Sequence, residues 1–353
     1  MSDPVRVRPQ VLADFARSAL TTVGMPSEHA GWAAEGMLWA DLRHLAAHGV
    51  AGKLPQCVGR IRAGGTNARP QLRTVKDFGA AVSLDGDGAW GQVAGVAAMD
   101  LATERALAHG VGLVTVRCTS SAAAMGHYAW RAAQRGTVAL ALTNGPALVA
   151  APEGNTRVVG NQGHAIACPD GAGGTVLYDS ATTLMSTGAM ETAHEQGAEL
   201  PVGVLRDRHG RPTRDPAEWA VGLLEPIGGH HGFGLSVGLE VLTGLLAGGD
   251  RFGATVGMPG ELGEPQGVSL SMVAIRVDLA SGAEEFGRAV STFRRQVRQS
   301  GPEDGLAPRL PGERGEGRAG AALRDGVLLS TAQLERLRRV GTDLGLDDLR
   351  VGG

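Results

Sequence analysis

The sequence predicts a mixed α/β protein in which helical segments from both ends of the chain accompany a central part of strands and helices. Two buried-type strands at 111–117 and 137–143 enclose a helical segment at 123–135. Helical periodicity dominates the beginning of the chain and returns at 283–299 and 331–345. No G-x-G-x-x-G follows a strand, which argues against a dinucleotide-binding Rossmann fold.

The first helices are predicted near the amino end. Residues 9–22 carry apolar side chains at helical spacing, and the Gly-Met-Pro run at 24–26 ends that helix. Ser27 is a suitable N-cap for a second helix that reaches about Arg43. A glycine- and proline-containing stretch at 63–71 then marks a boundary before the central part.

The central part begins with a helix over 91–109, which Gly110 ends. The strands at 111–117 and 137–143 are separated by one helix, and this spacing predicts a βαβ unit with the two strands as a parallel pair. A further strand is predicted over 175–183, and its last residues are polar.

The last third combines one strand with several helices. A glycine-rich turn feeds a helix within 228–249, and the alternating segment 268–279 predicts a strand. Amphipathic helices follow at 283–299 and 331–345. Between them, 300–326 is rich in Gly, Pro and Arg, which predicts a surface strap.

Composition excludes several classes of function. Among 353 residues, the net charge is −3 and aromatic residues make up 4%, so neither a nucleic-acid surface nor a membrane surface is expected. No apolar run is long enough to span a membrane and no signal-peptide pattern begins the chain, so we expect a cytoplasmic protein. Cys57, Cys118 and Cys168 are odd in number and far apart, which disfavours a disulfide scaffold.

Two further observations concern possible chemistry. His230 and His231 are adjacent on a turn and lack a partner at metal-ligand spacing, so no metal site is expected. Lys53 and Lys76 are the only lysines of the chain. The part of the chain after residue 76 therefore has no lysine amine that could take part in catalysis.

The segment ADLRHLAAHGV at 40–50 resembles the A-D-L-R-G-H-x-S-H-G-V stretch of the malate/L-lactate dehydrogenase family. That family also holds sulfolactate, ureidoglycolate and Δ1-piperideine-2-carboxylate oxidoreductases, and it is distinct from the Rossmann lactate dehydrogenases. The likeness covers about residues 8–347 and continues in register at 64–67, 85–92, 116–117, 179–183, 207–216, 228–235, 311–313 and 324–326.

The resemblance implies a non-Rossmann fold with two domains. Residues 1–75 together with 280–353 would form a helical domain, and 76–279 an α+β domain for cofactor and substrate. It also implies a homodimer and a small-molecule substrate. The implied reaction is hydride transfer between NAD or NADP and C2 of a 2-oxo, 2-hydroxy or cyclic imino acid.

The resemblance also implies roles for residues at matching positions. The expected catalytic residues are His48, Ser121 and His231. The expected cofactor-binding residues are Gly145, Asp179, Ser180, Ala181, His231 and Gly232, and the expected substrate-binding residues are Lys53 and His127. We expect His48, Ser121 and His231 to line one cleft, with Asp179 at its edge.

Several pocket positions depart from the family pattern. Ser121 stands where the family has its proton-donating histidine, and His231 stands where it has a lysine. Gly52 occupies the place of an arginine, with Lys53 one residue later. New polar residues occur at His44, His127, Asn161, Gln162, His164, His230 and His231.

Three hypotheses about function remain open. The first is an NAD(P)-dependent oxidoreductase that acts on a non-standard keto, imino or hydroxy acid, with a role in specialised metabolism. The second is an enzyme on the same scaffold that has lost hydride transfer, and with it the cofactor: a cyclase, isomerase, dehydratase or condensing enzyme. A catalytically silent homologue is the third alternative. Loss of the acid, the carboxylate clamp and the cofactor lysine is what the second and third predict.

Overall fold

The structure is a computed structural model that describes residues 4–302, 305–347 and 349. Its α-helices are α1 (Pro9–Thr22), α2 (Ser27–Leu42), α3 (Val50–Ala63), α4 (Gly91–His109), α5 (Met125–Ala133), α6 (Thr187–Glu195), α7 (His230–Glu240), α8 (Ala283–Gln299), α9 (Glu313–Asp325) and α10 (Thr331–Leu344). Shorter helical turns are η1 (Ala46–His48), η2 (Pro216–Ala220), η3 (Val241–Leu245, a π-helix) and η4 (Gly253–Thr255).

The strands form one large sheet and three small ones. They are β1 (Val5–Val7), β2 (Arg73–Asp77), β3 (Ala81–Ala89), β4 (Val111–Thr119), β5 (Thr137–Thr143), β6 (Val149–Ala150), β7 (Arg157–Val159), β8 (His164–Pro169), β9 (Thr175–Ser180), β10 (Leu205–Arg206), β11 (Pro212–Thr213), β12 (Leu223–Leu224), β13 (Val268–Arg276) and β14 (Val327–Leu329).

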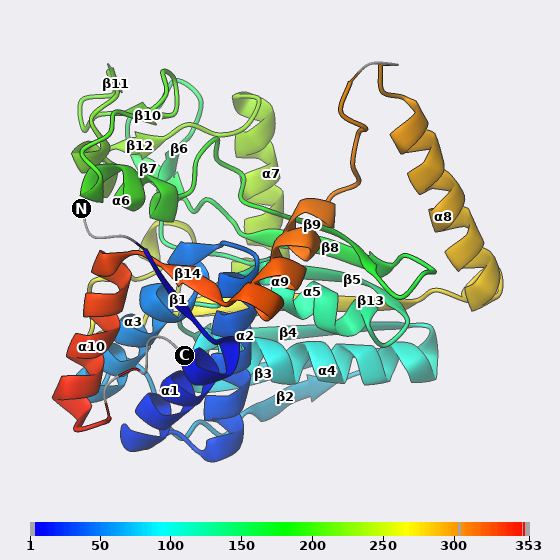
Figure 1. Ribbon diagram of the computed structural model, residues 1–353, viewed down its shortest axis with the longest axis horizontal. Helices are drawn as coiled ribbons and strands as arrows, with labels where there is room; N and C mark the ends of the chain where they lie inside the picture. The colour runs from blue at the N-terminus through cyan, green and yellow to red at the C-terminus, as the bar shows by residue number, and fades with distance from the viewer. Residues whose placement is uncertain (1–3, 303–304, 348, 350–353) are drawn as a thin grey trace.

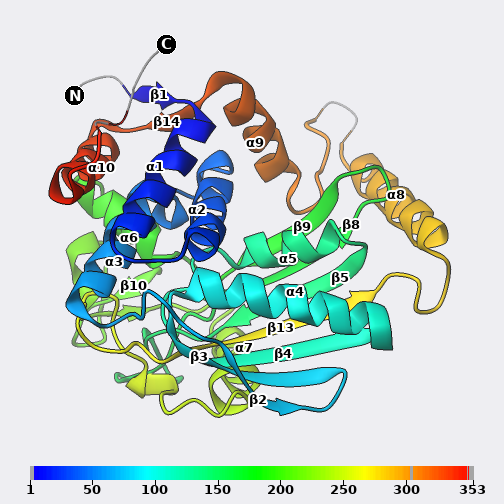
Figure 2. The same cartoon turned by 90° about the horizontal axis from the view of Figure 1, so that it is seen from below.

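The large sheet has the strand order β2-β3-β4-β13-β5-β8-β9 in the described part of the chain. Helices α4 and α5 cover one face and α7 lies on the other (Figure 2). The α4 face is rich in alanine, and Gly112 of β4 lies so close to Ala102 of α4 that a Cβ at 112 would overlap its carbonyl oxygen. Small residues therefore let helix and sheet pack closely. This architecture confirms the predicted mixed α/β class without a Rossmann sheet.

The pairing of β4 with β5 differs from the prediction. These two strands do run in the same direction, but β13 lies between them and is antiparallel to both. The hydrogen-bonded parallel pair is instead β3 and β4, which α4 connects. Local spacing could not reveal this, because β13 joins the sheet from more than 120 residues further along the chain.

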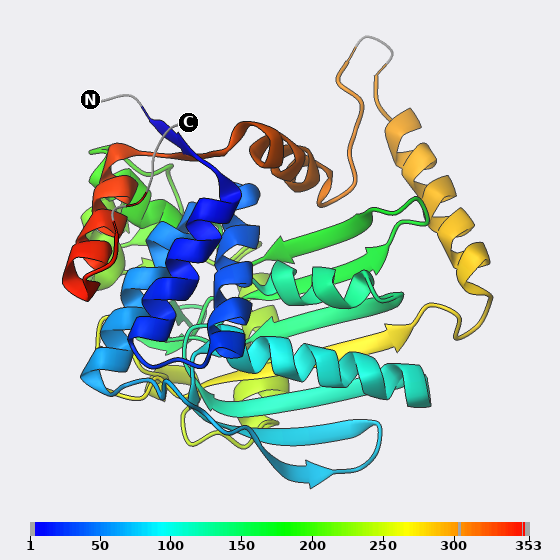
Figure 3. The same ribbon diagram turned by 60° about the horizontal axis from the view of Figure 1, so that its bottom comes forward.

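The helices at the two ends of the chain pack together on a shared apolar core. Strand β1 pairs antiparallel with β14, so that Val5 lies opposite Leu329. Leu20 of α1, Leu54 of α3 and Leu337 of α10 are buried in the same hydrophobic cluster. Figure 3 shows these helices side by side at one end of the sheet.

The predicted strap over 300–326 is wrong in part, because α9 covers Glu313–Asp325. Its glycines lower helix propensity, but the buried Ala319 and Ala322 hold it on the helical body, together with the ion pair from Glu316 to Arg43, which directly follows α2. Helix α8 lies apart from the other helices in Figure 1. It reaches the β8–β9 turn through Arg294, whose guanidinium is 2.6 Å from the Asp170 carboxylate.

A smaller lobe lies beside the sheet and carries α6 with the short strands β6, β7 and β10 to β12 (Figure 1). Its core is a separate apolar cluster that includes Leu148, Met190, Leu200 and Leu205. Within the described residues, no helix combines the length and the apolar character needed to cross a membrane.

Candidate functional site

The turn from α2 into α3 fixes the position of His48. The Asp41 carboxylate accepts a hydrogen bond from the backbone N–H of Val50 at 2.8 Å and so caps the start of α3. A Cβ at Gly49 would overlap this carboxylate, so only glycine fits there. Burial raises the pKa of Asp41 to about 7 against the effect of that N–H. The short turn η1, which ends at His48, is therefore held rigidly between two helices.

The next residues explain why no arginine stands at position 52. A Cβ on Gly52 would lie 2.6 Å from the carbonyl oxygen of Ala47 and 2.7 Å from that of Ala46. The backbone of η1 thus leaves no room for a side chain. Lys53 follows one residue later, and its Nζ donates a hydrogen bond to Gln56 Oε1 at 3.2 Å.

His48 and Lys53 lie close enough to influence each other. Burial, with a smaller contribution from the Lys53 charge, lowers the pKa of His48 to about 3. Burial also lowers the pKa of the Lys53 ammonium, and the Glu191 carboxylate opposes that shift. Both side chains nevertheless keep partial access to solvent. We call His48, Lys53, Gln56 and Glu191 the His48–Lys53 cluster.

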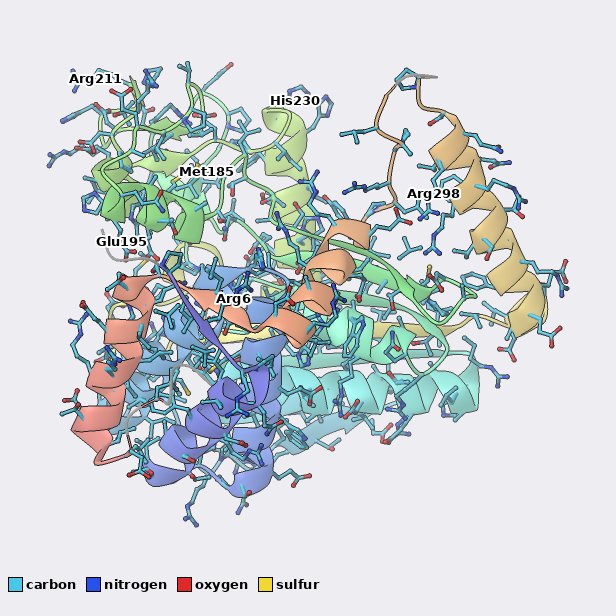
Figure 4. The ribbon with its side chains drawn as sticks, viewed as in Figure 1. Arg6, Met185, Glu195, Arg211, His230 and Arg298 are labelled. Carbon is cyan, nitrogen blue, oxygen red and sulfur yellow. The ribbon has the colours of Figure 1, made fainter. Side chains whose placement is uncertain are left out.

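Helix α6 packs against η1 and brings Glu191 into the His48–Lys53 cluster. Its Gly188 is so close to η1 that a Cβ there would overlap the Ala47 side chain. Glu191 lies one turn further along α6, and burial raises the pKa of its carboxyl group. Glu195, labelled in Figure 4, ties the end of α6 to α10 through Arg336 at 2.7 Å. Within the His48–Lys53 cluster, the Nδ1 atom of His48 is buried and has no hydrogen-bond partner among the described residues.

Ser121 lies in the loop between β4 and α5, and its backbone is tightly held. Its N–H donates to Gln266 Oε1 at 3.1 Å, and a Cβ on Gly91 would come within 2.6 Å of its carbonyl group. The neighbouring Ser120 accepts a hydrogen bond from Thr66 at 3.3 Å. Arg60 of α3 fixes the segment that carries Gln266 by donating to several of its carbonyl oxygens.

The end of β9 brings three of the expected cofactor-binding residues to the start of α5. Part of Asp179 reaches solvent, yet its surroundings desolvate the carboxylate and raise its pKa to about 6, opposed by the Gly126 N–H. Gly126 of α5 is so near that a Cβ there would lie 2.5 Å from Asp179 Oδ2. Ser180 and Ala181 follow directly, and the Ser180 hydroxyl donates to the Ala181 carbonyl at 3.1 Å.

The β9 end is joined to the glycine-rich turn before α7. The Ile227 N–H donates to the Thr182 carbonyl at 2.9 Å, and Ser236 Oγ donates to Thr182 Oγ1 at 2.7 Å. Gly228 and Gly229 both have positive φ, 60° and 61°, a conformation that favours glycine. A Cβ at Gly232 would overlap the Ile227 carbonyl oxygen. The segment around Ala181 and the turn containing Gly232 therefore form one unit.

His231 stands on the outside of this unit. His230 and His231 are both exposed, and their ring centroids are 3.9 Å apart. Figure 4 shows His230 at the outer end of α7. In the described part of the chain, no hydrogen bond or ion pair joins His48, Ser121 and His231.

His127 lies in a helix interface. It is 1% exposed, its Nε2 is 3.4 Å from Glu35 Oε1, and its Nδ1 is 3.2 Å from the place a Cβ would take on Gly36 of α2. Among the other new polar residues, His44 is exposed with a φ of 60°. His164 is buried, with its Nδ1 3.1 Å from the Gln162 carbonyl.

A buried polar network, which sequence reasoning missed, lies beneath the turn at 160–163. Gln162 Nε2 donates to Glu240 Oε2 at 2.5 Å, and Asn144 Nδ2 donates to Glu240 Oε1 at 3.1 Å. Gln162 has a φ of 30°, unusual for a non-glycine residue, and its Oε1 has no partner. Gly145 follows Asn144, and nothing lies within 4 Å of the place its Cβ would take. No local motif connects these residues, because they meet only after folding.

No cluster of three potential metal-binding side chains occurs among residues 4–302, 305–347 and 349. The three cysteines are free, and burial raises the pKa of each thiol. A reactive thiolate is therefore disfavoured.

Comparison with known proteins was made on this geometry. The model of the malate/L-lactate dehydrogenase family matches residues 7–338. A malate dehydrogenase of Pyrococcus abyssi is 32% identical over 98% of this chain and 97% of its own length. An NAD(+)-dependent ureidoglycolate dehydrogenase of Escherichia coli K12 is 28% identical over 86% of each chain. The solved structure of a sulfolactate dehydrogenase from Methanocaldococcus jannaschii superimposes with a TM-score of 0.88 at 28% identity, over 97% of this chain and 98% of that one.

Proposed function

The chain belongs to the malate/L-lactate dehydrogenase family, and from this premise we propose that it is an oxidoreductase. It transfers hydride between NAD or NADP and C2 of a small 2-oxo, 2-hydroxy or cyclic imino acid. The observation that carries the proposal is the His48–Lys53 cluster, where an amine and an imidazole are both desolvated and influence each other. A substrate carboxylate is the natural partner for that cation.

Binding of a carboxylate would change the protonation of Lys53 and His48. An anion beside Lys53 offsets the desolvation of its ammonium and removes the repulsion that contributes to the low pKa of His48. Both pKa values then rise, so that the ligand binds together with a proton. Affinity for a 2-oxo acid is expected to fall as pH rises.

The residues present fit a nicotinamide cofactor. The positive-φ glycines Gly228 and Gly229 open the backbone before α7, whose eleven residues give its amino end, at Gly232, a positive partial charge. We assign Gly145, Asp179, Ser180, Ala181, His231 and Gly232 to cofactor binding. The open space beside Gly145 and the unpartnered Gln162 Oε1 support this assignment. When bound, the cofactor donates or accepts the hydride.

Proton transfer is assigned to this chain's own residues. His48 is neutral at pH 7 in the free protein because burial lowers its pKa, and the rise of this pKa when a carboxylate binds beside Lys53 makes it a stronger base for the proton that a 2-hydroxy acid releases. Ser121 and His231 complete the proposed catalytic set, and Lys53 and His127 the substrate-binding set. His127 acts at one remove in this assignment, since it contacts Glu35.

A homodimer is proposed from one face of α7 and η3. In one chain, Leu235, Val241, Leu242, Leu245 and Leu246 are all between 42% and 54% exposed. Apolar side chains gathered on one helical face mark an interaction surface. We also propose the division into a helical domain, 1–75 with 280–353, and an α+β domain of 76–279, which the pairing of β1 with β14 supports.

Nicotinamide binding separates this function from its alternative. Purified protein is titrated with NADH and with NADPH while the nicotinamide fluorescence is recorded, and saturable binding of one of them is expected. Oxidation of the bound cofactor is then followed with a panel of 2-oxo acids. Absence of binding for both cofactors would refute the oxidoreductase. The alternative, a non-redox enzyme on this scaffold, is favoured by Ser121 at the position of the family's histidine.

A further inference from the structure

We propose that Arg60 is a positioning residue for Ser121. Its guanidinium takes the place of a bound cation inside the loop 257–266, and this loop in turn holds the backbone of Ser121. The inference deepens the proposed function, because it rests on that function for the catalytic role of Ser121. The contacts that carry it involve neither nicotinamide nor substrate.

The loop 257–266 closes on itself and has little apolar packing of its own. Its two ends meet, because the Gly257 N–H donates to the Gln266 carbonyl oxygen at 2.8 Å. Residues 260–265 between these ends are exposed, and Leu262, the one large apolar residue among them, is 40% exposed. Burial of apolar side chains therefore contributes little to the position of this loop. Hydrogen bonds must hold it instead.

Arg60 of α3 supplies these hydrogen bonds from inside the loop. Its side chain is fully buried and donates to the backbone carbonyl oxygens of Pro259 at 3.5 Å, Glu261 at 2.9 Å, Gly65 at 3.2 Å and Glu264. Among the residues that the structure describes, Arg60 forms no ion pair with a carboxylate. Carbonyl dipoles thus surround the guanidinium as they surround a bound metal cation. A lysine has too few donors, and the wrong geometry, for such a set of acceptors.

Two routes lead from Arg60 to the segment of Ser120 and Ser121. The first passes through the loop, because Gln266 at its end is buried and its Oε1 accepts a hydrogen bond from the Ser121 N–H at 3.1 Å. The second passes through Thr66, whose Oγ1 accepts from Arg60 Nε at 3.4 Å and donates to Ser120 Oγ at 3.3 Å. One guanidinium is therefore connected to two consecutive residues of this segment.

The same helix also carries Lys53 of the proposed substrate-binding set. Lys53 precedes Arg60 by seven residues, so the two side chains leave α3 on nearly the same side, about 10 Å apart along the helix axis. Arg60 therefore fixes the position of Ser121 relative to the helix that bears Lys53. Loss of this alignment should lower kcat and leave KM nearly unchanged, because substrate binding does not use Arg60.

Removal of the guanidinium and its return as a free ion test the proposal. An Arg60→Ala variant keeps the carbonyl oxygens and leaves a space of guanidinium size among them. Hydrogen–deuterium exchange of the Ser121 N–H is measured in the free protein, without nicotinamide or substrate. The solutions contain guanidinium chloride, sodium chloride or urea at equal concentrations, far below those that unfold proteins. Arg62→Ala is the matched control, since Arg62 is an exposed arginine of α3 that donates to the Asp343 carbonyl at 2.9 Å.

We expect Arg60→Ala to exchange the Ser121 N–H at least about tenfold faster than the unaltered protein, with β5 unchanged. Guanidinium should restore slow exchange, whereas sodium chloride and urea should not. Arg62→Ala should behave as the unaltered protein does in all three solutions. Unchanged exchange at Ser121 in Arg60→Ala, or fast exchange that guanidinium fails to slow, would each overturn the proposal.

Gln266→Leu keeps the test decisive if Arg60→Ala does not fold. This variant retains Arg60 with its carbonyl partners and removes only the acceptor of the Ser121 N–H, so exchange should accelerate at Ser121 and stay slow in β5. Equal exchange at Ser121 would overturn the proposal. In turnover assays, a rise in KM at unchanged kcat in Arg60→Ala would remove the positioning role. Failure of NADH and NADPH to bind would refute hydride transfer and leave the exchange results unaffected.

Discussion

A substitution at Gly52 tests the close contact between α3 and the backbone of η1. In a Gly52→Ala variant, the new Cβ would lie 2.6 Å and 2.7 Å from two carbonyl oxygens of η1. The nearer carbonyl must retreat by about 0.8 Å to reach an ordinary separation of 3.4 Å. Forced shifts of this kind cost about 1–3 kcal/mol. Alanine recovers at most about 1 kcal/mol of helix propensity. The free energy of unfolding should fall by up to about 2 kcal/mol.

Gly31 of α2 is the matched control. It is also a helical glycine, but nothing lies within 4 Å of the place its Cβ would take. Gly31→Ala should therefore raise the free energy of unfolding by about 1 kcal/mol. Urea denaturation of both variants measures the difference, expected at about 1–3 kcal/mol. A Gly52→Ala protein as stable as Gly31→Ala would refute the close approach of η1 to α3.

The remaining predictions concern charge, catalysis and assembly. The pKa of Asp41 is about 7 in the folded chain rather than 3.8, so the folded state binds this proton more tightly than the unfolded state does. The protonated Asp41 therefore stabilises the fold fully below pH 3.8, and this stabilisation is lost as the pH rises to about 7. Asp41→Asn keeps an acceptor for Val50 and should flatten urea-unfolding stability between pH 4 and 7; an unchanged slope would contradict the assignment. His48→Ala should abolish turnover of any 2-oxo or 2-hydroxy acid in a steady-state assay, and wild-type turnover would remove its catalytic role. Light scattering should give twice the mass of one chain, reduced to one chain mass by Leu242→Glu on the exposed α7–η3 face; a monomeric unaltered protein would refute the homodimer.

Elements that depend on local pattern could be predicted from the sequence. The helix over 91–109 and the strand at 137–143 correspond to α4 and β5, because periodicity and a following glycine or turn define them locally. The place of β13 could not be predicted, since its partners lie far away in the chain. Helix α9 was missed because tertiary packing outweighs the low helix propensity of its glycines.

The candidate site divides in the same way. Family motifs directed attention to His48 and Lys53, and the structure brings these two together. The close approach of the η1 carbonyl groups to Gly52 is a contact that no sequence pattern reveals. Glu240 and Gln162 are far apart in the chain, and only folding shows that they form a buried pair. Whether His48, Ser121 and His231 share one cleft stays a prediction.

The central position of β13 has a consequence for folding of the chain during its synthesis on the ribosome. Strands β4 and β5 are complete by residue 143, yet the strand that separates them ends at Arg276. During synthesis of the intervening segment, both strands present unpaired backbone groups, which are templates for association with other chains. The nascent chain therefore passes through a long interval in which the other strands of its large sheet are complete and the central strand is missing. Slow translation or a shortage of chaperones in that interval should lower the yield of soluble protein.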